Sequence, residues 1–481
     1  MRRGKYLAKN TAIFALGNIG TKAISFFMVP LYTQWLVPSD YGVVDLIATV
    51  AFVLMPVFTL NIGESVMRFD LDEGADYDRI MSVGIVFLLL SVALTFLVYP
   101  FSLFFSELAA YKSYLYLYCL TYGFSTILIC NLRGLERLLS YAIANIILTF
   151  GIAVFNMLFL GVFRMGVKGY LLSYIVAQFV VILFAFITGS VKHTVDNFSL
   201  NFDLLKEMVK YSFLLIPTSL MWWIMNSSDR LMVTAMIGVS ANGIYAISYK
   251  IPSFLTTLST VFNQAWSYSA IKENESTDKV CYTNKVYFQL LDNLIIITAV
   301  LLFLMKPFMK VYVSKEYYLA WKYTPYLLIG MLFCTLGTFL STAYTVNKDS
   351  KGFLWSGTIG AIVNIVLNLI LIPIMQCHGA ALATCISYIS VFIFRAIHTR
   401  KYLKLRLFIK NHYLSIGILI IMAFSMYINN MILSEMVLAI ELLLIMILKR
   451  DTLMLYFYSL KNLVYKMKRK RSVSDEHKDR M

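Results

Sequence analysis

The sequence has few charged residues, because Asp, Glu, Lys and Arg together make up only 14% of its 481 positions. Soluble domains carry about 25% charged residues and are about 45–50% apolar. This chain is instead 59% hydrophobic, with a mean hydropathy of +0.73. Its polar residues are too few to cover such a chain in water. We therefore predict an all-α integral membrane protein and exclude a soluble fold.

Metal-binding and catalytic motifs are also scarce. The six cysteines form no C-x-x-C pair and mostly lie in apolar runs, so we expect no disulfide framework and no metal site. Neither H-E-x-x-H nor G-x-S-x-G occurs. Segment 161–168 departs from a P-loop because its lysine comes one place late and no Ser or Thr follows. These absences argue against an enzyme and against a pump with its own ATPase.

The excess of basic residues has a membrane explanation. A formal net charge of +16 would suggest nucleic acid in a soluble protein. Here the basic residues lie between apolar runs and at the termini, so we predict no nucleic-acid partner. We expect the basic tail after residue 450 to stay on the cytoplasmic side and to contact anionic membrane lipids. The first apolar stretch is too long for a signal peptide and is interpreted as a permanent span.

A membrane span needs about 20 apolar residues. Dividing the sequence at charged and turn-rich breaks predicts about fourteen transmembrane helices, over residues 11–35, 42–67, 80–104, 114–132, 139–163, 169–189, 208–236, 241–270, 286–310, 320–346, 352–375, 379–399, 412–429 and 431–449. With a cytoplasmic N-terminus, 32 of the 42 Lys and Arg residues belong to inner segments and seven to outer loops. The positive-inside rule then predicts that both termini are cytoplasmic, in a multi-pass protein of the bacterial inner membrane.

An internal repeat predicts two lobes. The first span ends in Trp35-Leu36-Val37-Pro38-Ser39-Asp40-Tyr41-Gly42-Val43, and the seventh ends in Ile237-Gly238-Val239-Ser240-Ala241-Asn242-Gly243-Ile244. Both combine a long span, a short outer turn and a glycine that opens the next helix. Since six spans separate the copies, the repeats are parallel and related by an axis along the membrane normal. We expect pseudo-symmetric six-helix lobes at 1–206 and 207–411, transmembrane helices 13 and 14 at 412–449, and a cytoplasmic tail at 450–481.

Basic residues within the predicted spans are the main candidates for function. A charge in the middle of a membrane helix is costly, so it usually faces a wet cavity or a partner. Lys22 shares a helix face with Asn18 in the first span, and Arg230 shares one with Asn226 in the seventh. Lys250 lies in the eighth. We expect these residues to line a central cavity between spans 1, 2, 7 and 8, although snorkelling to the interface is an alternative for Arg230 and Lys250.

Several acidic residues are candidates for coupling or for charge pairs. Asp229 could pair with Arg230 or Lys250, and Glu64 lies four residues before Arg68, an order that favours an intrahelical pair. Arg68 is also a substrate-binding candidate. Asp45 lies at the start of a helix, where a carboxylate is favourable. The acidic loop 68–79 includes Asp70 and Asp72 and is interpreted as solvated, with a metal-binding pair of a glycosyltransferase as the alternative.

At this point the chain resembles a known family. Gly17-Asn18-Ile19-Gly20, Pro30-Leu31-Tyr32, the run from Pro38 to Leu46, the run from Glu64 to Phe69, the run from Asn226 to Arg230 and the run from Gly379 to Thr384 are similar to the Wzx-like polysaccharide transporters. These are flippases of the multidrug/oligosaccharidyl-lipid/polysaccharide exporter superfamily. The motifs cover about the first 400 residues, and their order together with fourteen spans makes the resemblance fairly specific.

The resemblance implies a function. It implies alternating access that moves undecaprenyl-diphosphate-linked oligosaccharides from the inner to the outer leaflet for O-antigen, capsule or exopolysaccharide, with a polysaccharide polymerase as a partner. It implies no cofactor and leaves coupling to H⁺ or Na⁺ open. Buried Lys and Arg suit a diphosphate cargo. The alternatives are a cation-coupled drug or metabolite exporter of the same fold, a membrane glycosyltransferase or polymerase that uses the acidic loop, and a scaffold that transports nothing.

Overall fold

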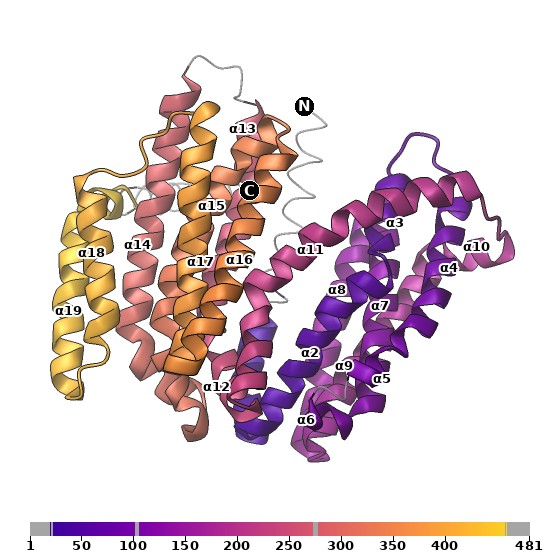
Figure 1. Ribbon diagram of the computed structural model, residues 1–481, viewed down its shortest axis with the longest axis horizontal. Coiled ribbons are helices and arrows are strands. Elements are labelled where there is room, and N and C mark those ends of the chain that lie inside the picture. The colour runs from indigo at the N-terminus through magenta and orange to yellow at the C-terminus, as the bar shows by residue number, and fades with distance from the viewer. Residues whose placement is uncertain (1–19, 21–22, 102–104, 273–277, 457, 459–481) are drawn as a thin grey trace, which may run out of the picture.

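The computed structural model describes residues 20, 23–101, 105–272, 278–456 and 458. Regular structure in these residues is helical, and Figure 1 shows two bundles of helices side by side. Eleven of the described helices are long and apolar enough to cross a membrane. The all-helical membrane fold is therefore confirmed, whereas the count of fourteen spans is not.

The N-terminal bundle begins with a helix over residues 23–35. Its other long helices are α2 (Pro38–Phe58), α3 (Ile62–Asp70), α4 (Tyr77–Thr95), α7 (Lys112–Gly134), α8 (Leu138–Asn156) and α9 (Gly166–Thr188). Short pieces complete it, namely α5 (Val98–Phe101), α6 (Ser106–Ala109), a π-helical turn over Met157–Val162 and α10 (Val191–Asp196).

The C-terminal bundle contains the described helices α12 to α19. These are α12 (Val239–Ser248), α13 (Pro252–Lys272), α14 (Lys279–Tyr312), α15 (Thr324–Val346), α16 (Ser350–Met375), α17 (Cys377–His398), α18 (Lys410–Ser425) and α19 (Met431–Leu448). The 3₁₀ turns Lys315–Lys322 and Thr399–Lys401 precede α15 and follow α17. The α18–α19 hairpin lies at the far edge of the bundle (Figure 1).

Polar contacts at both ends tie this hairpin to α14. Lys306 is buried, donates a hydrogen bond to Ser434 over 3.1 Å and stands over the ring of Trp321. At the other end Asp292 forms an ion pair with Lys449 and a hydrogen bond with His412. Lys306 lies near the outer end of the predicted span 286–310, and it is counted with the seven outer basic residues. Its burial explains why it does not act as a solvated loop charge.

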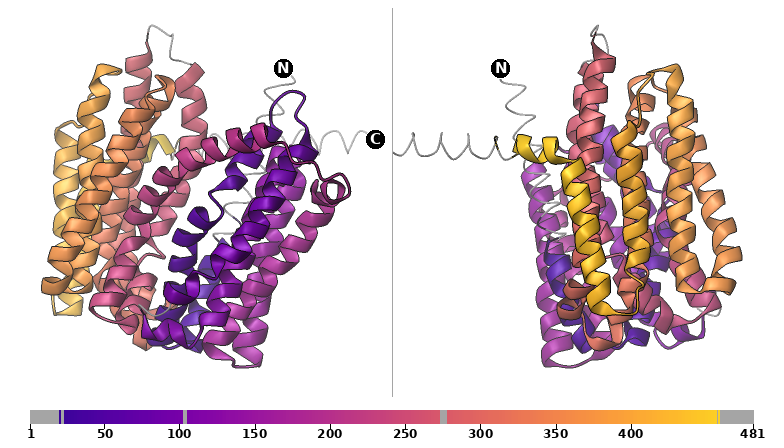
Figure 2. Two further views of the ribbon diagram at one scale, coloured as in Figure 1. Left: turned by 45° about the vertical axis from the view of Figure 1, so that its right-hand side comes forward. Right: turned by 90° about the vertical axis from the view of Figure 1, so that its left-hand side faces the viewer.

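The longest helix, α11 (Phe202–Met236), runs obliquely between the bundles (Figures 1 and 2). Its first half lies against the N-terminal bundle, where the Ser65 hydroxyl donates to the Met208 carbonyl over 2.6 Å. Pro217 lies within the helix, and the second half packs on α16, α12 and α2. Helix α11 therefore physically connects the two bundles and carries Arg230 to the place where they meet.

Two spans that the sequence predicts as continuous are broken. The span at 42–67 stops at Phe58 because Leu60 and Asn61 have φ values of 47° and 52°, in the left-handed region, and α3 restarts after them. The span at 241–270 stops at Ser248 and restarts at Pro252, whose ring nitrogen has no hydrogen to donate. The second break borders the cavity described below, because Tyr249 and Ser253 line it.

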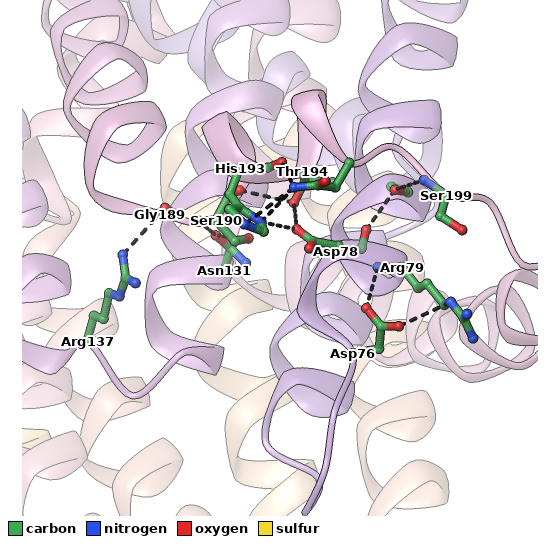
Figure 3. A network of polar contacts seen from close by, with 12 residues as sticks. Asp76, Asp78, Arg79, Asn131, Arg137, Gly189, Ser190, His193, Thr194 and Ser199 are labelled. Carbon is green, nitrogen blue, oxygen red and sulfur yellow. Dashed lines mark hydrogen bonds and ion pairs between the residues drawn. The ribbon is translucent and has the colours of Figure 1, made fainter.

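Each of four aspartates in the acidic loop 68–79 contacts a different partner, so the four do not form one cluster. Asp70 is buried and accepts a hydrogen bond from Asn131, whereas Asp72 pairs with Arg68 at the surface. Figure 3 shows that Asp76 pairs with Arg79, and that Asp78 contacts His193 and Thr194 of α10. The described residues contain no group of three or more His, Cys, Asp or Glu side chains that could hold a metal ion.

Candidate functional site

A cavity of about 680 Å³ lies where α2, α11, α13 and α15 meet. Its walls come from the second, seventh, eighth and tenth predicted spans, and they are lined by Phe52, Trp222, Asn226, Ser227, Arg230, Tyr249, Ser253, Thr256, Ser259, Thr260, Asn263, Ser267, Met331, Cys334, Thr335 and Thr338. A neighbouring pocket of about 270 Å³ shares Phe52, Ser227 and Arg230 with it and reaches Asp45. The volume falls in the range of about 300–1,000 Å³ that is common for small-ligand sites.

Arg230 is the charged residue that lines this cavity in the described structure. It lies at the end near Tyr249 and the start of α13, which is called the basic head below. Its guanidinium pairs with Asp45 of α2 at 3.0 Å and lies 4.9 Å from the centre of the Tyr249 ring. The Arg230 Nε atom is buried and has no hydrogen-bond partner in the described structure. Arg230 therefore has an acidic partner, in contrast to the expectation of an unpaired cation, and it keeps a free donor.

Lys250 lies in the break between α12 and α13. It lines a pocket of about 100 Å³ together with Ser25, Phe26 and Ser253, and Ser253 also lines the main cavity. Its ammonium stands 5.9 Å from the centre of the Tyr41 ring. The structure thus brings Lys250 beside the cavity that contains Arg230. Asn226 lines the same cavity and accepts a hydrogen bond from Tyr388 over 2.8 Å.

Asp229 faces away from Arg230, into the C-terminal bundle. Its carboxylate accepts hydrogen bonds from the hydroxyls of Tyr245, Tyr249 and Thr384. Asn364 donates to Thr384 over 3.3 Å, and the Asn368 carbonyl oxygen is buried without a partner in the described structure. The ion pair expected for Asp229 is replaced by hydroxyl contacts, and the result is a buried cluster rich in oxygen atoms.

The bundles touch at the end where α2 and α12 begin, which the charge bias predicts to be the outer side. A Cβ atom on Gly42 would lie 1.9 Å from the Val239 carbonyl oxygen, and one on Gly243 would lie 1.9 Å from the Pro38 carbonyl oxygen. The two contacts are related by the sequence repeat, because Gly42 corresponds to Gly243 and Pro38 corresponds to Val239. Asn242 adds a hydrogen bond to Asp45 over 3.3 Å, and Trp223 donates to the Thr49 carbonyl over 3.2 Å. This end of the cavity is closed by backbone contact.

The remaining predicted site residues lie elsewhere. Lys22 and Asn18 fall outside the described residues. Arg68 pairs with Asp72 and does not line the cavity described above. The predicted Glu64–Arg68 pair is wrong, because the Arg68 side chain extends forward along the helix to Asp72 rather than back to Glu64.

Sequence reasoning missed two features. One is the row of uncharged polar residues on α13, whose spacing of three or four residues could have indicated it. The other is Arg395, which is buried and donates to Ser356 and to the Gly337 carbonyl. Arg395 lies near the cytoplasmic end of a predicted span, where basic residues are common.

Comparisons with known proteins agree with this architecture. A family model described as "Polysaccharide biosynthesis protein" matches residues 7–268, more than half of the chain. No curated protein matches the chain at a significant level.

Solved structures show the same fold. The lipid II flippase MurJ in an inward closed conformation is 16% identical with a TM-score of 0.66, over 94% of this chain and 99% of MurJ. An inward-facing multidrug resistance MATE family transporter of the MOP superfamily is 12% identical with a TM-score of 0.65, over 81% of this chain and 95% of its own. A MOP superfamily transporter from Pyrococcus furiosus, whose binding pocket is described as having reverse polarity, has a TM-score of 0.52 at 15% identity, over 82% of this chain and 93% of its own.

Proposed function

The chain belongs to the polysaccharide biosynthesis protein family, and we propose that it is a flippase for a lipid-linked oligosaccharide. Family membership and the fold support a multi-pass membrane transporter or flippase. The finer proposal is that an undecaprenyl-diphosphate-linked repeat unit moves from the inner to the outer leaflet of the bacterial inner membrane, where a polymerase would use it for surface polysaccharide. Both termini would then be cytoplasmic, and the transport step would involve no catalysis by this chain.

The observation that supports this cargo is the basic head of the cavity. Arg230 lines the cavity, its Nε is buried without a hydrogen-bond partner in the described structure, and Lys250 lies beside the cavity. A diphosphate must lose hydration when it leaves water. Unit charges 4 Å apart attract each other by about 4 kcal/mol at an effective dielectric constant of about 20, which offsets much of that loss. A guanidinium can also hold two phosphate oxygens at once.

The ion pair between Asp45 and Arg230 could link cargo binding to the movement of the two lobes. Asp45 belongs to α2 of the N-terminal bundle, and Arg230 belongs to the half of α11 that packs on α12 and α16. Their ion pair would therefore help to hold the outer end closed. A diphosphate bound at Arg230 would compete with Asp45 for the guanidinium. Release of Asp45 would weaken the contact between α2 and α12, so that cargo binding favours opening on the outer side. This is alternating access driven by a difference in affinity between two states.

We propose that a coupling cation binds at the cluster around Asp229. Its donors are carboxylate, amide and hydroxyl oxygens, which small hard cations prefer, and the Asn368 oxygen lacks a partner in the described structure. Asp229, Asn364, Asn368 and Thr384 would hold Na⁺, and a proton on Asp229 is the other option. Cation binding can be measured by the rise in melting temperature that the bound cation causes. Purified protein should melt at a higher temperature in Na⁺ than in a bulky organic cation, and Asp229→Asn should remove the difference.

The second candidate is a cation-coupled drug or metabolite exporter, because a MATE transporter has the same fold. An exporter of cationic drugs would need an acidic cavity. Arg230 is instead the charged residue among those that line the 680 Å³ cavity in the described structure. That lining favours an anionic cargo.

The deciding experiment is surface-polysaccharide output in the native host from which the gene has been deleted. The wild-type gene should restore output, and Arg230→Ala should abolish most of it at a normal membrane level of protein. Arg230→Lys should keep an intermediate output, because the charge remains but the two-oxygen grip is lost. The exposed Arg400 gives a matched control, since Arg400→Ala should behave as wild type. Full output from Arg230→Ala, or none from wild type, would contradict the proposal.

A further inference from the structure

We propose that one face of α13 is a track for the saccharide part of the cargo, and that it recognises uncharged sugar residues next to the diphosphate. This inference rests on the proposed function, because it places the sugars of the lipid-linked cargo in the same cavity. It adds a direction for the cargo, a set of binding residues and a limit on sugar chemistry.

The track follows from the spacing of polar residues on α13. Apart from the adjacent pair at 259 and 260, the cavity-lining positions recur every three or four residues, so they lie along one face of the helix. These positions are Ser253, Thr256, Ser259, Thr260, Asn263 and Ser267. From the first to the last, the helix rises about 21 Å at 1.5 Å per residue. Thr335 and Thr338 of α15 line the same cavity.

The hydroxyls on this track face the cavity as acceptors. Thr256 donates to the Ser253 carbonyl over 2.7 Å, Thr260 donates to the Thr256 carbonyl over 2.8 Å, and Thr338 donates to the Cys334 carbonyl over 2.8 Å. Each hydroxyl proton is therefore used within its own helix, and the oxygen lone pairs stay available. Sugar hydroxyls are donors that match such a row.

Asn263 adds an unsatisfied group in the middle of the track. Its amide nitrogen donates to Ser259 over 2.9 Å, while its carbonyl oxygen is buried and has no partner in the described structure. A buried acceptor without a donor is costly. A sugar hydroxyl or acetamido N–H would supply the missing donor.

Aromatic side chains provide the other contact that a sugar ring uses. Trp222 and Phe52 both line the cavity, with 41% and 52% of their surfaces exposed. Phe52 also shares the smaller pocket with Arg230. Trp222 lies two turns before Arg230 on α11, about 12 Å further along the helix axis. The C–H face of a pyranose ring can pack on such rings while its hydroxyls reach α13 and α15.

The charge pattern sets the direction and the sugar class. The charged residue among those lining the main cavity in the described structure is Arg230, at the end where α13 begins. The diphosphate therefore binds at that end, and the sugars extend along α13 towards the predicted cytoplasmic side. Among the described residues the track offers no charged partner to a uronic acid or an amino sugar, and an unpaired charge is costly. The sugars nearest the diphosphate are thus uncharged.

A binding experiment with two lipids tests the track separately from the proposed function. One probe is undecaprenyl diphosphate without sugar. The other is the lipid-linked repeat unit that the deletion strain should accumulate. The test variant combines Thr256→Val, Thr260→Val and Thr338→Val, which remove hydroxyls at nearly constant volume. Thr358→Val on α16 is the control, because Thr358 also bonds its own helix but is not among the residues lining the cavity.

The triple variant should bind the sugar-free lipid as wild type does and bind the sugar-linked lipid at least tenfold more weakly. Each lost hydrogen bond lowers affinity by roughly two- to tenfold. Unchanged binding of the sugar-free lipid also shows that the variant is folded. Equal binding of the sugar-linked lipid by the triple variant and the Thr358→Val control would overturn the track while leaving the flippase intact. Wild-type protein that binds neither lipid would instead contradict the flippase.

The isolated repeat unit gives an independent measurement. Mass spectrometry of the accumulated lipid should find uncharged sugars at the reducing end. A charged first sugar would overturn the inferred sugar class.

Discussion

The contact between Gly42 and Gly243 yields the sharpest prediction. Gly42→Ala should push the protein out of the outer-closed state, because the new Cβ would lie 1.9 Å from the Val239 carbonyl oxygen. The atom in the way is backbone, so no side-chain rotation relieves the clash. The start of α2 must move away from α12 by more than 1 Å, since ordinary carbon–oxygen contacts are well above 3 Å.

The size of the effect follows from overpacking. Adding a methyl group to a well-packed contact costs about 1–3 kcal/mol. The gain in helix propensity from Gly to Ala, up to about 1 kcal/mol, applies equally to both conformations and does not shift the balance between them. An energy of about 1–3 kcal/mol corresponds to a change of about 5- to 150-fold in that equilibrium. Gly243→Ala should act similarly, because its Cβ would lie 1.9 Å from the Pro38 carbonyl oxygen.

The assay is labelling from the outside. Thr49 is buried just inside the outer closure, so Thr49→Cys in a background without native cysteines reports its opening. An impermeant thiol reagent should label it about 5- to 150-fold faster in intact cells when Gly42→Ala is present. Gly417→Ala is the matched control, because Gly417 lies in α18 and no atom lies within 4 Å of its ideal Cβ position. Equal labelling with Gly42→Ala and Gly417→Ala would refute the outer closure.

Three further predictions follow. Asp45→Asn should bind undecaprenyl diphosphate more tightly than wild type and yet lower polysaccharide output, since it frees Arg230 and weakens the outer contact; weaker binding in a filter assay would contradict the competition. Cysteines at Ser39 and Asn429 should react with an impermeant reagent in intact cells and one at Lys348 should not, whereas the reverse pattern would invert the topology. Burial raises the pKa of Asp70 to about 7, although the hydrogen bond from Asn131 opposes this shift. Because an unfolded aspartate ionises near pH 3.9, the folded state binds more protons between about pH 4 and 7, and stability falls as pH rises through that window. Asp70→Asn should flatten the fall in melting temperature measured across this range, and an unchanged profile would be evidence against the shift.

Much of the fold could be predicted from the sequence. Apolar runs of about 20 residues indicate membrane helices because unsatisfied backbone groups are costly in lipid. The repeat around Gly42 and Gly243 was also visible, and the structure shows these two positions in contact. The breaks at Leu60–Asn61 and Tyr249–Ile251 were not predicted, because each is a local backbone conformation inside a strongly apolar run.

The site was predictable only in part. A charge within an apolar run stands out, so Arg230 and Lys250 could be chosen as candidates from their position alone. Their partners could not, because Asp45 lies 185 residues before Arg230 and nothing local links them. Asp229 shows the limit most clearly, since its neighbour Arg230 points to the cavity while Asp229 meets Thr384, 155 residues away.

The sequence by itself determined that this is a helical membrane protein with a repeated plan and buried basic residues. Hydrophobicity, charge and periodicity are local properties, and the bilayer acts on them one helix at a time. Only the tertiary structure decided that Asp45 neutralises Arg230, that two glycines close one end, and that the polar face of α13 lines a cavity. Those features depend on which helix faces meet, and the packing of the whole bundle sets that.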